Sequence, residues 1–260
     1  MAIRYDKINL SDLGVRAEVA RFDARGEVTE WHVMLHVEPR CDLFQKQMQR
    51  IYEAEDRLTG MPGFEGSRYV MKRYFLSDST NQQPLMRKQP DISISIIQQQ
   101  PLDGSKIAVW LYMQSHTQVA NENGMVVVSH NGYKHLWKMG MHQHKGDSAW
   151  QTESVLIEYE EALQNFGATL ADNCVRTWFF VRDVDTQYAG MVKARKDNFT
   201  EQGLTQDTHY IASTGIGGAT PVRHATVAID FLTYPDIQES DKKYLQALEH
   251  LNPTHEYRVA

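Results

Sequence analysis

The chain has 260 residues, of which 42% are hydrophobic and 23% are charged. This is the composition of a globular protein with a substantial apolar core, and the length suits two ordinary domains better than one. The formal net charge of −6 argues against a general nucleic-acid or membrane-surface role, because binding to phosphates needs a basic face.

The two cysteines, Cys41 and Cys174, are too few for a disulfide framework and indicate a reducing compartment. The first ten residues contain no apolar run typical of export, and no later run approaches the length of a membrane span. We therefore expect a cytoplasmic protein with neither nucleic acid nor a membrane as its partner.

The first half of the chain predicts strands, one helix and further strands. Residues 1–40 predict strands, because apolar and polar side chains alternate on both sides of a turn at Arg25-Gly26. Cys41 to Leu58 predicts a helix with one apolar side. Arg68 to Asp78 predicts a strand, and the Gln- and Asn-rich stretch Ser79 to Pro90 predicts a loop or a weak helix.

The last two runs of the first half, ISISIIQQQP and KIAVWLYMQ, predict a hairpin around Asp103-Gly104. The second half begins in the same way, since Gly124 to Met141 predicts two extended runs around an Asn131-Gly132 turn. It ends in the same way too, because HYIASTGIGG and HATVAIDFLTY predict a final strand pair.

Between these runs the second half predicts a helix, a strand and a second helix. Asp147 or Ser148 can cap the first helix, and Gly167 suits a left-handed stop after it. The expected apolar face of this helix consists of Trp150, Val155, Leu156, Tyr159, Ala162, Leu163 and Phe166. The strand is NCVRTWFFVRD. The second helix is expected to present Tyr188, Met191, Val192, Arg195 and Phe199 on one side.

The repeated order of elements predicts an internal duplication of about 115–120 residues. We expect an α+β fold with one domain at 1–118 and a second at 124–234, separated by the polar stretch His116 to Gly124. Each domain should be a mostly antiparallel sheet with two helices on one face.

The middle of the second copy resembles the RidA/YjgF family, also labelled endoribonuclease L-PSP. The resemblance rests on the A-L-x-x-x-G-A phrase from Ala162 to Ala168 and on the V-x-T-x-x-F-V-x-D strand from Val175 to Asp183. The phrase VRTWFFVRDVD is also similar to the chorismatases, which share that fold. The resemblance covers about Leu136 to Tyr234 and implies two tandem chorismate mutase-like domains.

Proteins of this family are trimers, so the resemblance implies a homotrimer or a pseudo-trimer of linked copies. Residues 235–260 bear on this choice. Asp236 to Leu251 predicts a charged helix, and PTHEYRVA begins to alternate like a strand. This segment is expected to be either a helical linker that leads into a third copy or an ordinary tail.

The glycine-rich stretch Ser213 to Gly218 is the first candidate site. It is expected to be either a strand end that needs close backbone approach or a loop whose backbone N–H groups hold a carboxylate. In the family, an arginine at this place grips the substrate carboxylate, and here Thr214 stands in its position. The expected substrate-binding residues are Thr214, Gly215, Ile216 and Gly217, together with Arg176.

Asp230 is the expected catalytic residue. It lies among apolar neighbours in VAIDFL and matches the position of a strand glutamate in the family. A carboxylate there needs hydrogen-bond partners or holds a proton, and the alternative is a satisfied, half-exposed aspartate. In the first copy, Ile92 falls near the arginine position, and Val109 or Trp110 falls near the glutamate position. That copy is therefore expected to be catalytically empty.

Three further arginines and four histidines are candidate site residues. Arg182, Arg195 and Arg223 are, with Arg176, alternatives for the missing carboxylate clamp, because a guanidinium matches a carboxylate. They are otherwise surface arginines whose stems cover apolar side chains. The histidines are His130, His135, His142 and His144. No carboxylate or cysteine completes a metal triad with them, so we expect no metal and no cofactor.

Three functions remain open. The resemblance implies an enzyme that hydrolyses enamine or imine intermediates of small carboxylated metabolites, and the missing arginine opposes it. The phrases VRTWFF and ASTGIGG favour a chorismatase-like hydrolase of an enolpyruvyl ether, with Asp230 as the acid. The third is a non-catalytic scaffold or a module that senses a carboxylated metabolite. Ribonuclease activity, which the family label suggests, finds no support in the acidic charge.

Overall fold

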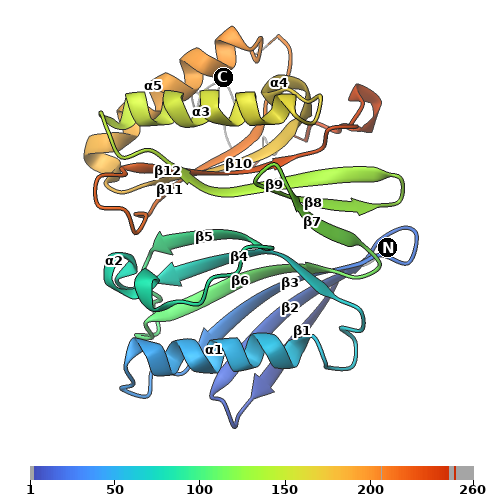
Figure 1. The fold of residues 1–260 in the computed structure, drawn as a ribbon, viewed down its shortest axis with the longest axis vertical. Helices are drawn as coiled ribbons and strands as arrows, with labels where there is room; N and C mark the ends of the chain where they lie inside the picture. Colours follow the sequence, from blue (N-terminus) through green and yellow to red (C-terminus); the bar gives the residue numbers. More distant parts are fainter. Residues whose placement is uncertain (1–2, 206, 246–248, 250–260) are drawn as a thin grey trace. The chain divides into compact units, whose positions relative to one another are not determined.

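The computed structural model describes residues 3–205, 207–245 and 249. The chain forms two compact units that divide between Tyr133 and Lys134. It contains two six-stranded mixed sheets with helices packed on them, so the fold is α+β, as predicted (Figure 1). The predicted domain ranges 1–118 and 124–234 stay predictions.

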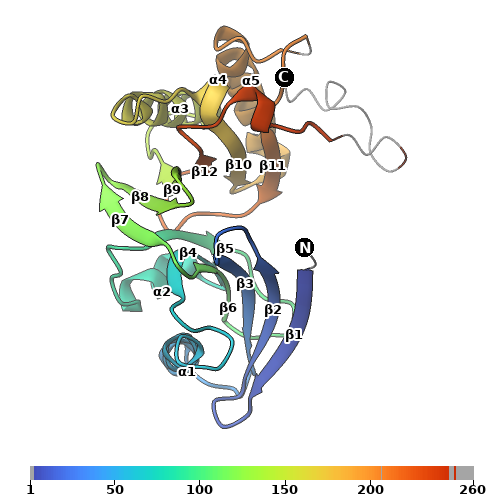
Figure 2. The ribbon, with the colours of Figure 1, turned by 90° about the vertical axis from the view of Figure 1, so that its right-hand side faces the viewer.

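The first sheet has the strand order β1-β2-β3-β6-β4-β5. Its strands are β1 (Ile3–Leu10), β2 (Val15–Asp23), β3 (Thr29–Val37), β4 (Arg68–Leu76), β5 (Ser93–Gln98) and β6 (Ile107–Gln114). Neighbouring strands are antiparallel except for the parallel pair β4 and β5. Figure 2 shows β1 at the edge of this sheet.

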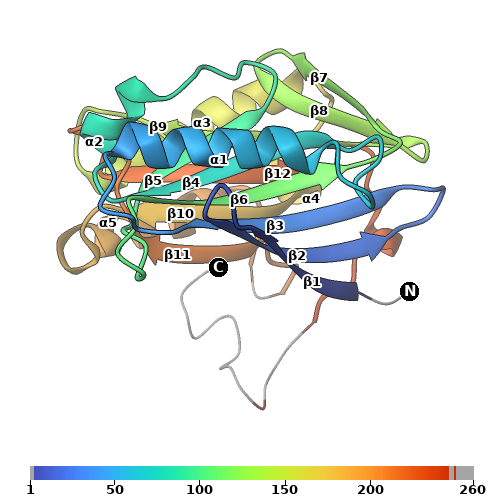
Figure 3. The same ribbon diagram turned by 90° about the horizontal axis from the view of Figure 1, so that it is seen from below.

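Helix α1 (Phe44–Leu58) covers one face of the first sheet, as Figure 3 shows. Its buried side chains join those of the strands in one apolar core. Members of this core include Phe44, Met48, Ile51, Leu58, Trp31, Leu35, Tyr74, Val109 and Leu111. The stretch predicted as a loop or weak helix holds the short helix α2 (Ser79–Gln82) and the 3₁₀ helix η1 (Gln83–Leu85).

A buried ion pair lies between α1 and β4. The ammonium of Lys72 donates to Glu55 Oε2 at 2.7 Å and to Gln89 Oε1 at 2.7 Å, and Tyr74 donates to Glu55 Oε1 at 3.1 Å. Burial raises the pKa of Glu55 and lowers that of Lys72, because each charge has left water. Each charge is therefore held in the core by the other.

The second sheet has the order β11-β10-β12-β9-β8-β7. Its strands are β7 (Gln118–Glu122), β8 (Met125–His130), β9 (Tyr133–His142), β10 (Cys174–Val181), β11 (Ala212–Gly217) and β12 (Val227–Thr233). Each strand of the first sheet has its counterpart six strands later, and β10 with β11 is again a parallel pair. The duplicated order of elements is confirmed.

Helices α3 (Ser148–Gln164) and α5 (Val184–Glu201) cover one face of the second sheet, and α4 (Leu170–Asn173) is a single turn between them. Asp147 caps α3 through Trp150 N–H at 2.9 Å, and Gly167 has a φ of 63°, so both predicted helix ends are confirmed. Tyr159 stacks on Phe231 with ring centroids 3.7 Å apart. This contact fixes which face of β12 belongs to the core.

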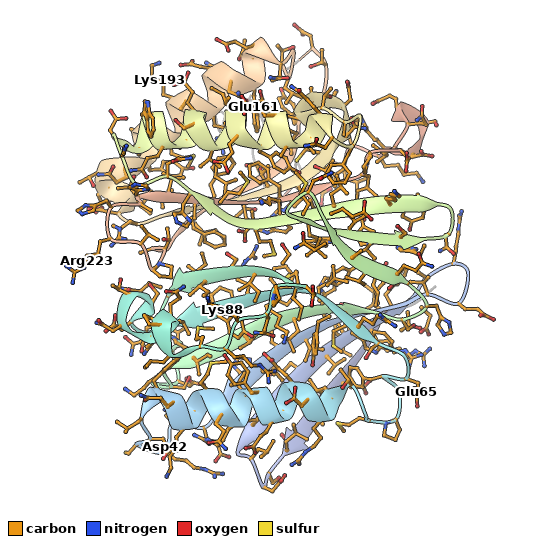
Figure 4. All side chains as sticks on the ribbon, in the orientation of Figure 1. Asp42, Glu65, Lys88, Glu161, Lys193 and Arg223 are labelled. Atoms are coloured by element: carbon orange, nitrogen blue, oxygen red, sulfur yellow. The ribbon has the colours of Figure 1, made fainter. Side chains whose placement is uncertain are left out.

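Most of the predicted helix faces are correct, but Trp150 is 45% exposed. It stands in the first turn of α3, and a Cβ at Gly146 would lie 3.0 Å from its ring. Trp150 therefore packs on the capping loop and not on the sheet. Figure 4 shows Glu161 of α3 and Lys193 of α5 pointing away from the sheet, on the solvated sides of these helices.

The two predicted hairpins are wrong. Strand β4 lies between β5 and β6, and β10 lies between β11 and β12. The turn residues at Asp103-Gly104 reverse the chain, but they do not decide which strands pair. In the first sheet β4 takes the inner place because its central residues, Val70 to Tyr74, are all buried.

Two further expectations are corrected. The stretch His116 to Gly124 is not only a polar separator, because it contains β7 and a turn at Asn123-Gly124 with φ of 50° and 74°. The helix predicted from Asp236 is absent as far as Leu245, where the described chain has only the 3₁₀ helix η2 (Glu239–Asp241). The rest of that prediction lies outside the described residues, apart from Glu249.

We predict that Lys72→Met destabilises the protein by about 3–5 kcal/mol, because Glu55 is left buried without its nearest cation. Arg87 stays 3.5 Å from Glu55 and is half exposed, so it compensates only in part. Lys72→Met combined with Glu55→Gln should recover most of the loss. The measurement is the free energy of unfolding in urea.

The control is Lys46→Met, which removes a surface ion pair to Asp42 at 3.8 Å and should cost less than about 1 kcal/mol. Equal losses in Lys72→Met and Lys46→Met would show that the buried pair is not an anchor of the first unit.

Candidate functional site

Three side chains form a row across the second sheet. Trp178 of β10 pairs with Thr214 of β11 on one side and with Asp230 of β12 on the other. Directly paired residues point to the same face of a sheet. The neighbouring residue Phe231 stacks on Tyr159 of α3, so Thr214, Trp178 and Asp230 lie on the opposite face, which we call the helix-free face.

Arg176 adds a cation to this row. It lies two residues before Trp178 and therefore on the same face. Its guanidinium donates from Nη2 to Thr214 Oγ1 and lies 5.0 Å from the centroid of the Trp178 ring. The guanidinium of Arg176 thus reaches Thr214, the position at which the resemblance places the family's arginine.

Asp230 is fully buried and accepts a hydrogen bond from the backbone N–H of Gly140 at 2.6 Å. This bond depends on a bulge in β9. Met141 pairs with Ile229 and Lys138 pairs with Phe231, so two residues of β9 oppose Asp230 alone. A bulge of this kind places a glycine in a left-handed conformation, and Gly140 has a φ of 69°.

A histidine supports the bulge from within the same strand. His142 Nδ1 lies 2.8 Å from the carbonyl oxygen of Gly140, and since a carbonyl only accepts, His142 donates. The bulged residue is therefore held through its N–H by Asp230 and through its C=O by His142. From the sequence, His142 was considered only as a metal ligand.

A group of aromatic side chains continues the row beyond Trp178. Trp137 of β9 stacks on Trp178 with ring centroids 6.4 Å apart, and its Nε1 donates to His135 Nδ1 at 2.8 Å. His135 in turn stacks on Tyr234 at 5.4 Å. The sequence analysis missed Trp137. The signal for it was the alternation of His135 and Trp137 on a strand next to that of Asp230.

The expectation of a loop with donating N–H groups is wrong. Thr214 to Gly217 belong to strand β11, and their backbone pairs with β10. Neither Gly215 nor Gly217 has a positive φ. A Cβ at Gly215 would lie 2.9 Å from the ring of Tyr188 on α5, so this glycine allows close packing, which was the alternative prediction.

The other three candidate arginines lie away from the face that carries Asp230. Arg182 donates to the carbonyls of Val222 and Ala225 at 2.8 and 3.1 Å, so its role is to hold that loop. Arg223 is exposed and points outward in Figure 4. Arg195 lies on the helix-covered side. Only Arg176 brings a guanidinium to the face that carries Asp230.

The first sheet has a different set of side chains in the same places. Its register matches Ser95, Arg73 and Trp110 to Thr214, Trp178 and Asp230. Trp110 was one of the two residues expected at the position of the acid, and the register confirms it. Ile92, in contrast, lies outside β5 and is not the counterpart of Thr214. Arg73 lies 4.9 Å from the centroid of the Trp110 ring, so a cation–π contact occupies this row and the carboxylate is missing.

No group of three His, Cys, Asp or Glu side chains in the described part of the chain is arranged to hold a metal ion. Cys174 is buried, and burial raises the pKa of its thiol to about 12. It is therefore a core residue. None of the described helices is long and apolar enough to cross a membrane.

The site offers a cation and a carboxylate on one sheet face, with an indole between them. Neighbouring strands lie about 4.8 Å apart, so β11 and β12 are about 10 Å apart across β10. A ligand whose carboxylate binds the Arg176 guanidinium, beside Thr214, would direct its other end toward the strand that carries Asp230. Such an arrangement is suited to proton transfer at a carbon remote from the anchoring carboxylate.

We predict that Asp230→Asn unfolds at nearly the wild-type urea concentration, whereas Asp230→Leu loses about 1–3 kcal/mol. Asparagine keeps an oxygen for the Gly140 N–H, and leucine leaves that buried donor unsatisfied. Equal stability of the two variants would show that the bond between Asp230 and Gly140 is dispensable.

The known proteins to which this chain is similar are solved structures of low sequence identity. No family model matches the chain, and no curated protein matches it. A chorismatase structure is similar with a TM-score of 0.46 and 17% identity, over 69% of this chain and 53% of that chain. The chain therefore spans about half the length of that chorismatase.

Two YjgF structures are also similar. One is a YjgF family member from Neisseria meningitidis, with a TM-score of 0.33 and 20% identity over 41% of this chain and 82% of that chain. The other is the YjgF gene product from E. coli, with a TM-score of 0.34 and 18% identity over 40% and 83%. The two groups that the sequence resembles are thus the groups to which the structure is similar.

Proposed function

We propose that the protein binds and hydrolyses a small carboxylated metabolite on the helix-free face of the second sheet. The observation that carries this proposal is the row formed by Arg176, Thr214, Trp178 and Asp230 on three adjacent strands. A guanidinium matches a carboxylate, and a nearby carboxyl group can move a proton.

Each residue of the row has a separate role in the proposal. Arg176 binds the substrate carboxylate, and Thr214 orients its guanidinium. Trp178 is the apolar floor, to which Ile216 adds because it alternates with Thr214 on β11. Asp230 moves the proton, and the bulge at Gly140 orients it. Gly215 and Gly217 face α5 and take no part in binding.

The proposed reaction class is hydrolysis of an enamine or imine. Asp230 protonates the enamine carbon, water adds to the resulting iminium carbon, and the C–N bond then breaks, which releases ammonia and the keto acid and returns a proton to Asp230. An imine enters the same sequence at the addition of water. The chorismatase-like alternative, hydrolysis of an enolpyruvyl ether, also begins with protonation of a C=C carbon. The separation of about 10 Å between β11 and β12 favours this alternative, because the guanidinium of Arg176 reaches Thr214 on β11 and a carboxylated ring can span the distance from there to Asp230 on β12. Pyruvate-sized substrates are shorter.

We predict that calorimetric titration with pyruvate, 2-ketobutyrate or a chorismate analogue detects binding. Arg176→Gln should weaken it about 10- to 100-fold, because a charge-assisted hydrogen-bond pair is lost. Asp230→Asn should abolish turnover and leave binding measurable. The matched control is Arg223→Gln, which removes an exposed arginine of the same unit and should change neither property.

An absence of heat with all three ligands would exclude the enzyme and favour a non-catalytic scaffold. Binding without turnover in the wild type would instead favour a module that senses a carboxylated metabolite. If Arg223→Gln weakened binding as much as Arg176→Gln, the loss would be due to the change in net charge and not to a specific contact of Arg176.

Assembly into a homotrimer, or a pseudo-trimer of linked copies, is part of the same proposal, as is a cytoplasmic location. Helices cover one face of each sheet, and the partly exposed indoles of Trp110 and Trp178 lie on the other faces. Exposed aromatic side chains of this kind are typical of contact surfaces. Both cysteines are free, which suits a reducing compartment.

We predict a mass of three chains in light scattering coupled to size-exclusion chromatography. The physical reason is that a threefold arrangement covers the helix-free faces with each other. A stable monomer at micromolar concentration, without a third copy of the domain in the native protein, would contradict the assembly and leave the proposed site to be tested on its own.

A further inference from the structure

Arg195 is a buried cation on the helix-covered side of the second sheet. It belongs to α5, is 1% exposed, and its guanidinium lies 5.3 Å from the centroid of the Phe179 ring of β10. Nη1 donates to Ser213 Oγ of β11 at 3.3 Å. No carboxylate of the described chain pairs with this guanidinium. An unpaired buried charge is costly, so a partner for it is expected.

Two nitrogen atoms of Arg195, Nε and Nη2, have no hydrogen-bond partner among the residues that the structure describes. They share the side-on edge of the guanidinium, where two N–H bonds run parallel and match the two oxygens of a planar oxyanion. Phe179 and Ser213 hold the guanidinium by its face and by its Nη1 end. The edge that binds a carboxylate is therefore buried and left without a partner among the described residues.

The hydroxyl groups next to Arg195 are arranged as donors. Thr177 Oγ1 donates to Ser213 Oγ at 3.0 Å, and Ser213 Oγ also accepts from Arg195. Because this oxygen already accepts twice, its own proton is left to donate. Ser213 of the edge strand β11 and Tyr188 of α5 are half-buried, so this part of the unit is the one nearest to solvent.

The first unit shows how the same fold neutralises a cation on the helix-covered side of its sheet. The register matches Thr177 to Lys72, which also faces the helix layer. Lys72 has its own carboxylate, Glu55 of α1, at 2.7 Å. In the second unit the cation comes from α5, and no acidic side chain of the described residues takes the place of Glu55. The second unit therefore lacks the counter-ion that the first one carries.

We propose that Arg195 binds a small planar monovalent oxyanion of the carboxylate or bicarbonate class, buried between α5 and the β10–β11 pair. This site differs from the proposed substrate site, because Ser213 and Thr214 are consecutive on β11 and face opposite sides of the sheet. A bound anion neutralises the guanidinium and fixes α5 on the strand whose other side carries Thr214.

The test is thermal unfolding of the full chain in sodium formate or sodium gluconate at equal ionic strength. Formate should raise the unfolding midpoint in a saturable way, whereas gluconate is too large to enter. Arg195→Lys keeps the charge and loses the planar edge, so it should weaken the formate effect at least tenfold. Lys193→Met, an exposed cation of the same helix, should leave the effect unchanged.

A second measurement needs no variant. The ¹³C signal of formate should broaden in the presence of the wild-type protein and should do so equally with Arg176→Gln. Equal midpoints in the two salts, with an unbroadened signal, would overturn the inference, because water would then occupy the edge of Arg195. Loss of the effect in Arg176→Gln but not in Arg195→Lys would also overturn it and assign formate to the proposed substrate site.

Discussion

The strict alternation of side chains along β10 is the constraint on which the site depends. This strand has a parallel neighbour on one side and an antiparallel one on the other, so its pairing fixes every residue on it to one of two faces. Thr177 and Phe179 face the helices, and Arg176 and Trp178 face away from them. A shift of the register by one residue would exchange the two sets and leave no cation beside Asp230.

The difference between the two copies arises from one extra residue in β9. In the first sheet β3 and β6 pair without interruption, and Met34 lies opposite Trp110. In the second sheet the bulge at Gly140 turns a backbone N–H toward the position of Asp230. A carboxylate is stable there because the backbone supplies a donor, whereas an unbroken ladder uses its N–H groups between strands. The bulge therefore supplies the donor that the buried acid needs, and the two features depend on each other.

Much of the fold was predictable from local patterns, and the pairing of strands was not. Asp147 and Gly167 mark the ends of α3 because capping and left-handed stops act within a few residues. The order of strands is set by contacts distant in sequence, which explains why both predicted hairpins failed. Asp230 was identified from its apolar neighbours. Its place beside Trp178, on the sheet face that also carries Arg176, was hidden, because it follows from the pairing.

Lys72 and Arg195 show that the two units neutralise a buried cation in different ways. Both cations lie under a helix layer, where burial lowers their pKa, and both therefore need a compensating charge or hydrogen bonds. Lys72 is a point charge whose three protons reach Glu55 and Gln89 in different directions. Arg195 has a planar fork, half of which is satisfied by Ser213 and by the ring of Phe179. A fork in a fixed plane cannot turn toward distant acceptors, so whatever neutralises it must come to the edge. The duplicated fold has thus kept a buried cation in both copies and changed where its partner comes from.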